Sequence, residues 1–223
     1  MNEGTGNAWT VPTPFKKAGQ AYDGSFVNDK RSTTLYASDR DIFLFLVDER
    51  HPISIDDQTY FRGFYTWNSE VGKATFGLST FLYSYVCANR IIWGARDLEE
   101  LTIRHTSVAP DRFIEQATPA LAALSEASPE PIISTIRKAK ATHVGKDTKE
   151  VEEFLAKKGF GKFESKVAIS LAARGGDTGS SGDPTNLWDL INGGTAAARE
   201  IGRQDDRLDL EKKWSSLLRE VRN

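Results

Sequence analysis

Apolar and polar residues follow two different periods along the chain, and the change falls near Pro110. Before that point, residues 42–47 form an unbroken apolar run of strand length, and residues 60–67 place aromatic side chains on both faces of an extended segment. After it, apolar residues recur at intervals of three and four, as on amphipathic helices. The pattern predicts an α+β fold that is β-rich over residues 40–108 and α-helical over residues 110–223.

Turn-forming residues divide the first part further. Residues 68–73 contain Asn, Ser and Gly and lead into an apolar segment that starts at Ala74, which predicts an antiparallel hairpin. Ser79 or Thr80 is a candidate N-cap for a helix over the apolar residues that follow. Residues 101–105 alternate like another short strand. We therefore expect an antiparallel hairpin or sheet with one helix packed on it.

Helix start and stop signals organise the second part. Asp147 and Thr148 suit the beginning of a helix, and Gly159 is placed to end it. Further helices are predicted over residues 113–124, 132–139, 163–174 and 207–221, and another begins over residues 186–191.

Composition bounds the domain organisation and the setting. We expect residues 1–34, rich in Gly, Pro, Asn, Ser and Thr, to be an irregular arm, and residues 35–223 to form one domain with a flexible loop at 175–184. Hydrophobic residues make up 39% of the 223-residue chain and charged residues 27%, which is typical of globular proteins. The single cysteine, Cys87, and the absence of a signal-type start predict a cytoplasmic protein. No apolar run approaches the ~20 residues that a membrane span needs, so no membrane contact is expected.

Catalytic motifs are weak throughout the sequence. The string DTGSS at residues 177–181 resembles an aspartic-protease motif, but a glycine-rich loop precedes it and no second copy exists. The same loop lacks the Gly-Lys-Ser/Thr of a nucleotide-binding loop, and the three histidines have no metal-ligand spacing. We therefore predict no catalytic residue, no metal and no cofactor, and we expect the protein not to be an enzyme.

A family resemblance is carried by several ordered segments. These are TWNSEVGKATFGLSTFLYSYVCANRIIWGARD at residues 66–97, IRHT at 103–106, LWDLINGGTAAAR at 187–199 and DLEKKWSSLL at 209–218. Together they resemble the phage/plasmid-like protein family, which is described as a domain of unknown function. The resemblance covers roughly residue 40 to the C-terminus. It implies a mobile-element or bacterial-cytoplasm setting and brings no established activity.

Two functions from different classes remain open. The first is sequence-nonspecific DNA binding, in a homo-oligomer that assists recombination or replication. The order of hairpin, helix, strand and basic helices is similar in outline to single-strand-annealing recombinases, and residues 101–175 carry 12 basic against 9 acidic side chains in a chain of net charge −2. Aromatic residues that could stack bases and basic residues that could hold phosphates make up the predicted site: Arg62, Tyr65, Trp67, Lys73, Arg90, Arg96, Arg104, Lys157, Lys158 and Lys162.

The other interpretations involve no nucleic acid. The aromatic strand could equally be hydrophobic core with charges at its rim, and residues 158–163, KGFGKF, could simply end a helix and bury Phe160. The alternative function is a protein-binding module that inhibits a host defence protein or assembles with partner subunits, with the helix around Trp214 as a docking face.

Overall fold

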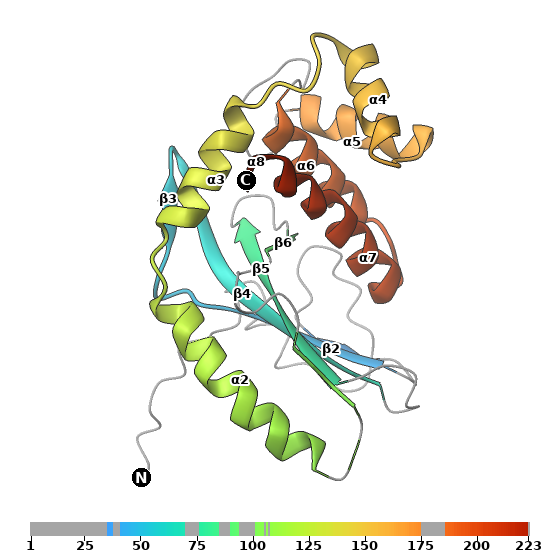
Figure 1. Ribbon diagram of the computed structural model, residues 1–223. Helices are drawn as coiled ribbons and strands as arrows, with labels where there is room; N and C mark the ends of the chain where they lie inside the picture. The colour runs from blue at the N-terminus through green and yellow to red at the C-terminus, as the bar shows by residue number, and fades with distance from the viewer. Residues whose placement is uncertain are drawn as a thin grey trace. The chain divides into compact units, whose positions relative to one another are not determined.

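The computed structural model describes residues 35–37, 41–69, 76–84, 90–93, 101–104, 106, 108–174 and 186–222. Within these ranges the protein is α+β, with antiparallel strands in the N-terminal part and helices mostly in the C-terminal half, which confirms the predicted fold class (Figure 1). The predictions for the N-terminal arm, for Lys73, Cys87 and Arg96, and for the loop at 175–184 lie outside the described residues.

The contacts within the chain divide it into two compact units. The first comprises Met1–Ile53, Tyr60–Tyr83 and Trp93–Ala127, and the second comprises Ser54–Thr59, Ser84–Ile92 and Ser128–Asn223.

The first unit is built on an antiparallel sheet. The hydrogen-bonded order of the strands begins β1 (Leu35–Ala37), β2 (Asp41–Val47), β4 (Gln58–Ser69) and β5 (Phe76–Ser84), with β7 (Leu101–Ile103) paired to β5. The short strand β3 (Ile53–Ile55), most of which belongs to the second unit, pairs with β4. β2 and β4 run antiparallel in a register that sets Phe45 opposite Tyr65 and Leu46 opposite Phe64. The strands predicted at 42–47 and 60–67 are therefore confirmed.

Helix α2 (Ala109–Glu126) covers one face of this sheet. Phe113, Ala117 and Leu121 of the helix pack with Phe64 of β4 and Leu78 of β5. The helix packs on the sheet in this way because the 3.6-residue period predicted for residues 113–124 aligns these side chains on one stripe of the helix. Full burial of a Leu or Phe side chain stabilises a fold by about 1.5–3 kcal/mol.

The segment that follows the polar turn is a strand, so the helix predicted from Ser79 or Thr80 is wrong. β5 is buried along almost its whole length, since Leu78 faces α2 while Phe81 packs edge-on against Phe45 of β2. A strand buried on both faces is continuously apolar, and its sequence lacks the alternation that would distinguish it from a buried helix.

The second unit is mainly helical. It contains β6 (Arg90–Ile92), α3 (Glu130–Ala141), α4 (Thr148–Lys157), α5 (Lys162–Ala173), α6 (Leu187–Ala198), α7 (Gln204–Ser215), the 3₁₀ turn η1 (Ser216–Leu218) and α8 (Arg219–Arg222). α6 is its most buried helix, and α5 and α7 both pack against it (Figure 1). The indole ring of Trp214 lies directly over Gly194, where a Cβ atom would overlap it. Among the described residues, no helix has both the length and the apolarity to cross a membrane.

Candidate functional site

Arg62 is part of the interior of the first unit. Its side chain is among the buried polar groups, and its Nη2 donates to the carbonyl oxygen of Ala127 at 2.6 Å, while Nη1 donates to that of Ser125 at 3.5 Å. Arg62 thus satisfies carbonyl groups at the C-terminal end of α2, which have no partner within the helix. Burial lowers the pKa of Arg62 below its ordinary value, and the nearby Asp48 carboxylate partly offsets this. The predicted phosphate contact by Arg62 does not fit this geometry.

Arg90, which belongs to the second unit, is likewise held by hydrogen bonds within the protein. Its Nε and Nη2 atoms donate to Oε1 of Glu211 at 3.2 and 3.1 Å, and Nε of Arg207 donates to the same oxygen at 2.8 Å. The Glu211 side chain is fully buried and that of Arg90 is 5% exposed. A cation buried in such a cluster could reach phosphate only by giving up its hydrogen bonds to the Glu211 carboxylate.

Of the predicted base-stacking residues of β4, Tyr65 belongs to the core and Trp67 is half-buried. Tyr65 is fully buried and stacks on Phe45 with ring centroids 5.2 Å apart. Trp67 lies 5.5 Å from the Tyr65 ring, and its indole occupies the space beside Gly77 of β5. The alternative interpretation of this strand, as hydrophobic core, fits the geometry better than a stacking surface does.

The remaining predicted residues within the described ranges are exposed. Arg104 directly follows β7, and Lys157, Lys158 and Lys162 flank the turn between α4 and α5. The three lysines therefore lie around one turn of the second unit, whereas Arg62, Tyr65 and Trp67 belong to the first unit.

Local signals in the sequence build the turn between α4 and α5. The Asp147 carboxylate accepts a hydrogen bond from the Glu150 N–H at 2.9 Å and caps α4. Gly159 has φ +83°, a conformation that glycine adopts without strain, and ends the helix as predicted. Phe160 then turns inward, with its ring 4.1 Å from that of Trp214 and the Lys213 ammonium 4.5 Å above it. The expected burial of Phe160 is thus correct.

Positive charge remains at this turn after its ion pairs are counted. Lys158 pairs with Glu220 at 2.9 Å, and the acid in the first turn of α5, Glu164, is bound by Lys213 at 2.9 Å. Lys157, Lys162 and Lys166 are exposed and form no ion pair with any residue that the structure describes. We call these three residues the turn lysines.

Phe163 is a surface residue that the sequence analysis did not assign to the site. Its side chain is 83% exposed, although it lies in the first turn of α5. Helix geometry accounts for this exposure, because the buried positions of α5 are Ser165, Ala168, Ile169 and Ala172, and Phe163 falls outside that stripe.

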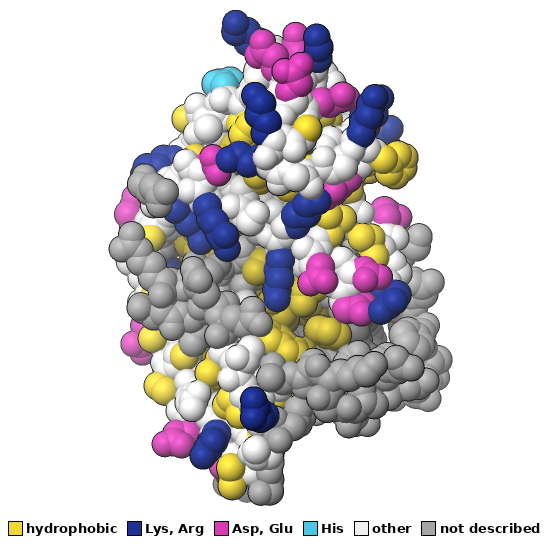
Figure 2. Space-filling view, turned by 45° about the vertical axis from the view of Figure 1, so that its right-hand side comes forward, with side chains coloured by type: hydrophobic (Ala, Val, Ile, Leu, Met, Phe, Trp, Pro, Cys, Tyr) yellow, Lys and Arg dark blue, Asp and Glu magenta, His cyan; other side chains and the backbone are white. Residues whose placement is uncertain are grey.

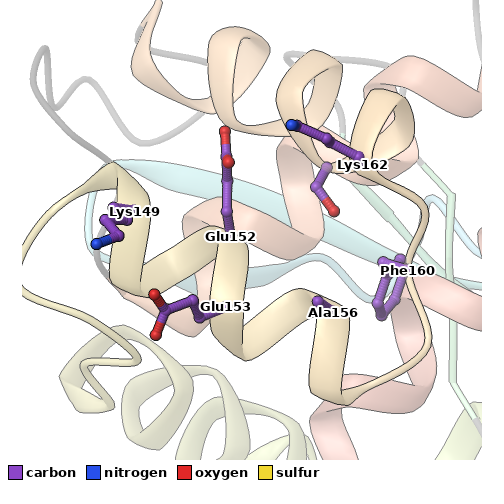
Figure 3. A pocket seen from close by; sticks show the side chains of 7 residues that line it. Lys149, Glu152, Glu153, Ala156, Phe160 and Lys162 are labelled. Carbon is purple, nitrogen blue, oxygen red and sulfur yellow. The ribbon is translucent and has the colours of Figure 1, made fainter.

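A cleft of about 320 Å³ lies between α4 and α5 (Figure 3). Its apolar side is formed by Ala156 and Phe160, and its charged groups are two lysines and two glutamates; the lining comprises Lys149, Glu152, Glu153, Ala156, Phe160, Lys162 and Ser165. The balanced charges make the cleft itself a poor anion site. Lys162, one of the two lysines in the lining, directly precedes Phe163 in the sequence.

Charges of both signs are interspersed over the face drawn in Figure 2, where no continuous basic stripe is visible. On this face, any attraction for a polyanion therefore depends on local groups of basic side chains. No cluster of His, Cys, Asp or Glu that could hold a metal is found among the described residues.

Comparisons with known proteins add nothing to this geometry: no protein-family model matches the sequence, and no curated protein or solved structure is significantly similar to it. The resemblance to the phage/plasmid-like family therefore stays a prediction.

Proposed function

We propose that the protein is a non-catalytic, sequence-nonspecific DNA-binding protein that contacts the phosphate backbone through the turn between α4 and α5. The observation that supports this proposal is the presence of three exposed ammonium groups, the turn lysines, at the turn and in the first two turns of α5, with no ion pair to any residue that the structure describes. Arg62, Arg90 and Tyr65 are left out of the proposed surface because they are buried.

Lysine chemistry suits nonspecific binding. An ammonium group recognises phosphate as a point charge and carries no pattern of donors that would distinguish base edges. Each phosphate that is neutralised releases counterions, so three contacts give a log–log dependence of affinity on salt with a slope of about −2 to −3. Affinity at physiological salt is then modest for one copy of the chain, and self-association would raise it by multivalency. In a mobile-element and cytoplasmic setting, such binding would serve recombination or replication.

A salt titration with a charge-matched control tests the proposal. The test variant replaces the three turn lysines by glutamine (K157Q, K162Q and K166Q together), and the control replaces Arg137, Lys138 and Lys146, which are exposed in the same unit but outside the turn. Fluorescence anisotropy with a labelled 20-nucleotide strand is measured from about 25 to 200 mM salt. We expect the test variant to bind at least tenfold more weakly at low salt, with a slope shallower by about 2 to 3, while the control changes less than threefold.

Two outcomes would contradict this function. Equal losses in both variants would show that only total charge matters, and absent binding of the wild-type chain at 25 mM salt would leave the protein-binding alternative. Ile114 of α2, 63% exposed, would then be the first residue to test as a protein contact.

A further inference from the structure

Phe163 is the most exposed large apolar side chain among the described residues. It is 83% exposed, against 63% for Ile114 and 46% for Val108. The neighbouring aromatic residue of the turn, Phe160, is buried, so the two phenylalanines of this segment differ in exposure. An exposed phenyl ring contributes little to folding and is available to a partner.

Two of the turn lysines flank this ring. Lys162 precedes Phe163 in the chain, and Lys166 lies three positions after Phe163 and four after Lys162, so Lys166 adjoins both of these side chains on the α5 surface. The intervening acid, Glu164, accepts hydrogen bonds from the Gly161 N–H at 3.2 Å and from Lys213 at 2.9 Å. Its charge is thus already compensated next to the ring.

We infer that Phe163 stacks on an unpaired base of a strand whose phosphates are held by Lys162 and Lys166, and that this surface therefore selects single-stranded over duplex nucleic acid. The inference rests on the proposed function and specifies the kind of strand. In a duplex the base faces are covered by neighbouring base pairs, so only an unpaired base offers a face to the ring. Stacking tolerates any base, because every base has a π-face, and this agrees with binding that does not depend on sequence.

The experiment separates stacking from charge. The full-length chain and its Phe163→Ala and Phe163→Trp variants are titrated at 50 mM salt with three probes of equal length: a mixed-sequence single strand, the matching duplex, and a single strand of abasic deoxyribose phosphate. Ile114→Ala is the control for loss of an exposed apolar side chain. Thermal melts verify that each variant is folded, which is expected because the substituted side chain is exposed.

The wild-type chain is expected to bind the single strand about tenfold more tightly than the abasic strand or the duplex. Phe163→Ala removes this preference and leaves the salt slope unchanged, while Phe163→Trp and Ile114→Ala retain it. If Phe163→Ala keeps the preference for the single strand, the inference is overturned and the ring is left as a protein contact. The proposed function still survives in that case if the turn-lysine variant loses binding. Absent binding of all three probes by the wild-type chain would overturn both.

Discussion

Substitution of Arg90 should destabilise the second unit rather than weaken DNA binding specifically. Arg90 and Arg207 share Oε1 of Glu211, and all three side chains lie at or below 9% exposure. Arg90→Met removes two of the three hydrogen bonds to that oxygen and one of two buried cations. Glu211→Gln instead leaves both guanidinium groups beside a neutral amide.

The expected magnitude follows from the burial of this cluster. Removal of one partner from a buried ion pair costs about 3 to 5 kcal/mol, because the remaining charge stays desolvated. Arg90→Met should fall near the lower end, since Arg207 still neutralises Glu211, and Glu211→Gln near the upper end. With a urea m-value of about 2 kcal/mol/M, these losses shift the unfolding midpoint by about 1.5 to 2.5 M.

Urea unfolding followed by circular dichroism at 222 nm measures this effect, because helices α3 to α8 belong to the second unit. Arg203→Ala is the control, since Arg203 also pairs with acids but is 74% exposed, and we expect no change in its midpoint. In the double variant of Arg90 and Glu211, the losses should be less than additive by about 1 to 3 kcal/mol. A loss below about 1 kcal/mol in Arg90→Met, or strict additivity, would refute the argument that the cluster is a coupled, buried unit.

Two further substitutions test the packing and the electrostatics. Gly194→Ala should destabilise the second unit by about 1 to 3 kcal/mol, because the added methyl overlaps the Trp214 ring, whereas Gly202→Ala meets open space and should leave the thermal midpoint unchanged. Burial disfavours the Asp48 carboxylate, but hydrogen bonds from His51, from the Ser125 hydroxyl and from a backbone N–H outweigh it and lower the pKa of Asp48. A lowered pKa of Asp48 stabilises the folded state above pH 4, and this stability is lost as the pH falls through the lowered pKa. Asp48→Asn should therefore cost about 2 kcal/mol of folding free energy at pH 7 and make acid unfolding below pH 4 less steep. An unchanged acid-unfolding profile would contradict the stabilising role of the Asp48 carboxylate.

Periodicity predicted the elements that have one buried face. α2 and α4 appeared where their apolar stripes indicated, and the cap at Asp147 and the stop at Gly159 follow from side-chain and backbone chemistry that is local in sequence. β5 was missed because both of its faces are covered, which removes the alternation that identifies a strand.

The candidate site was harder to predict because charge alone does not show where a side chain lies. Arg90 is a surface residue by type, yet its carboxylate partner is 121 positions away in the chain, and no local pattern links them. Phe163 is the opposite case, since an apolar residue in a helical pattern suggests core, yet its side chain is exposed. Its place outside the buried stripe of α5 becomes decisive only once that stripe is known.

Lysine reactivity with and without DNA tests the central claim most directly. The full-length chain is acetylated under limiting reagent in the presence and absence of a saturating single-stranded oligonucleotide, and each lysine is quantified by mass spectrometry. We expect reduced reactivity at Lys157, Lys162 and Lys166 and unchanged reactivity at the exposed Lys138 and Lys146. Unchanged reactivity at the turn lysines, or protection confined to other parts of the chain, would contradict the assignment of the α4–α5 turn as the nucleic-acid contact.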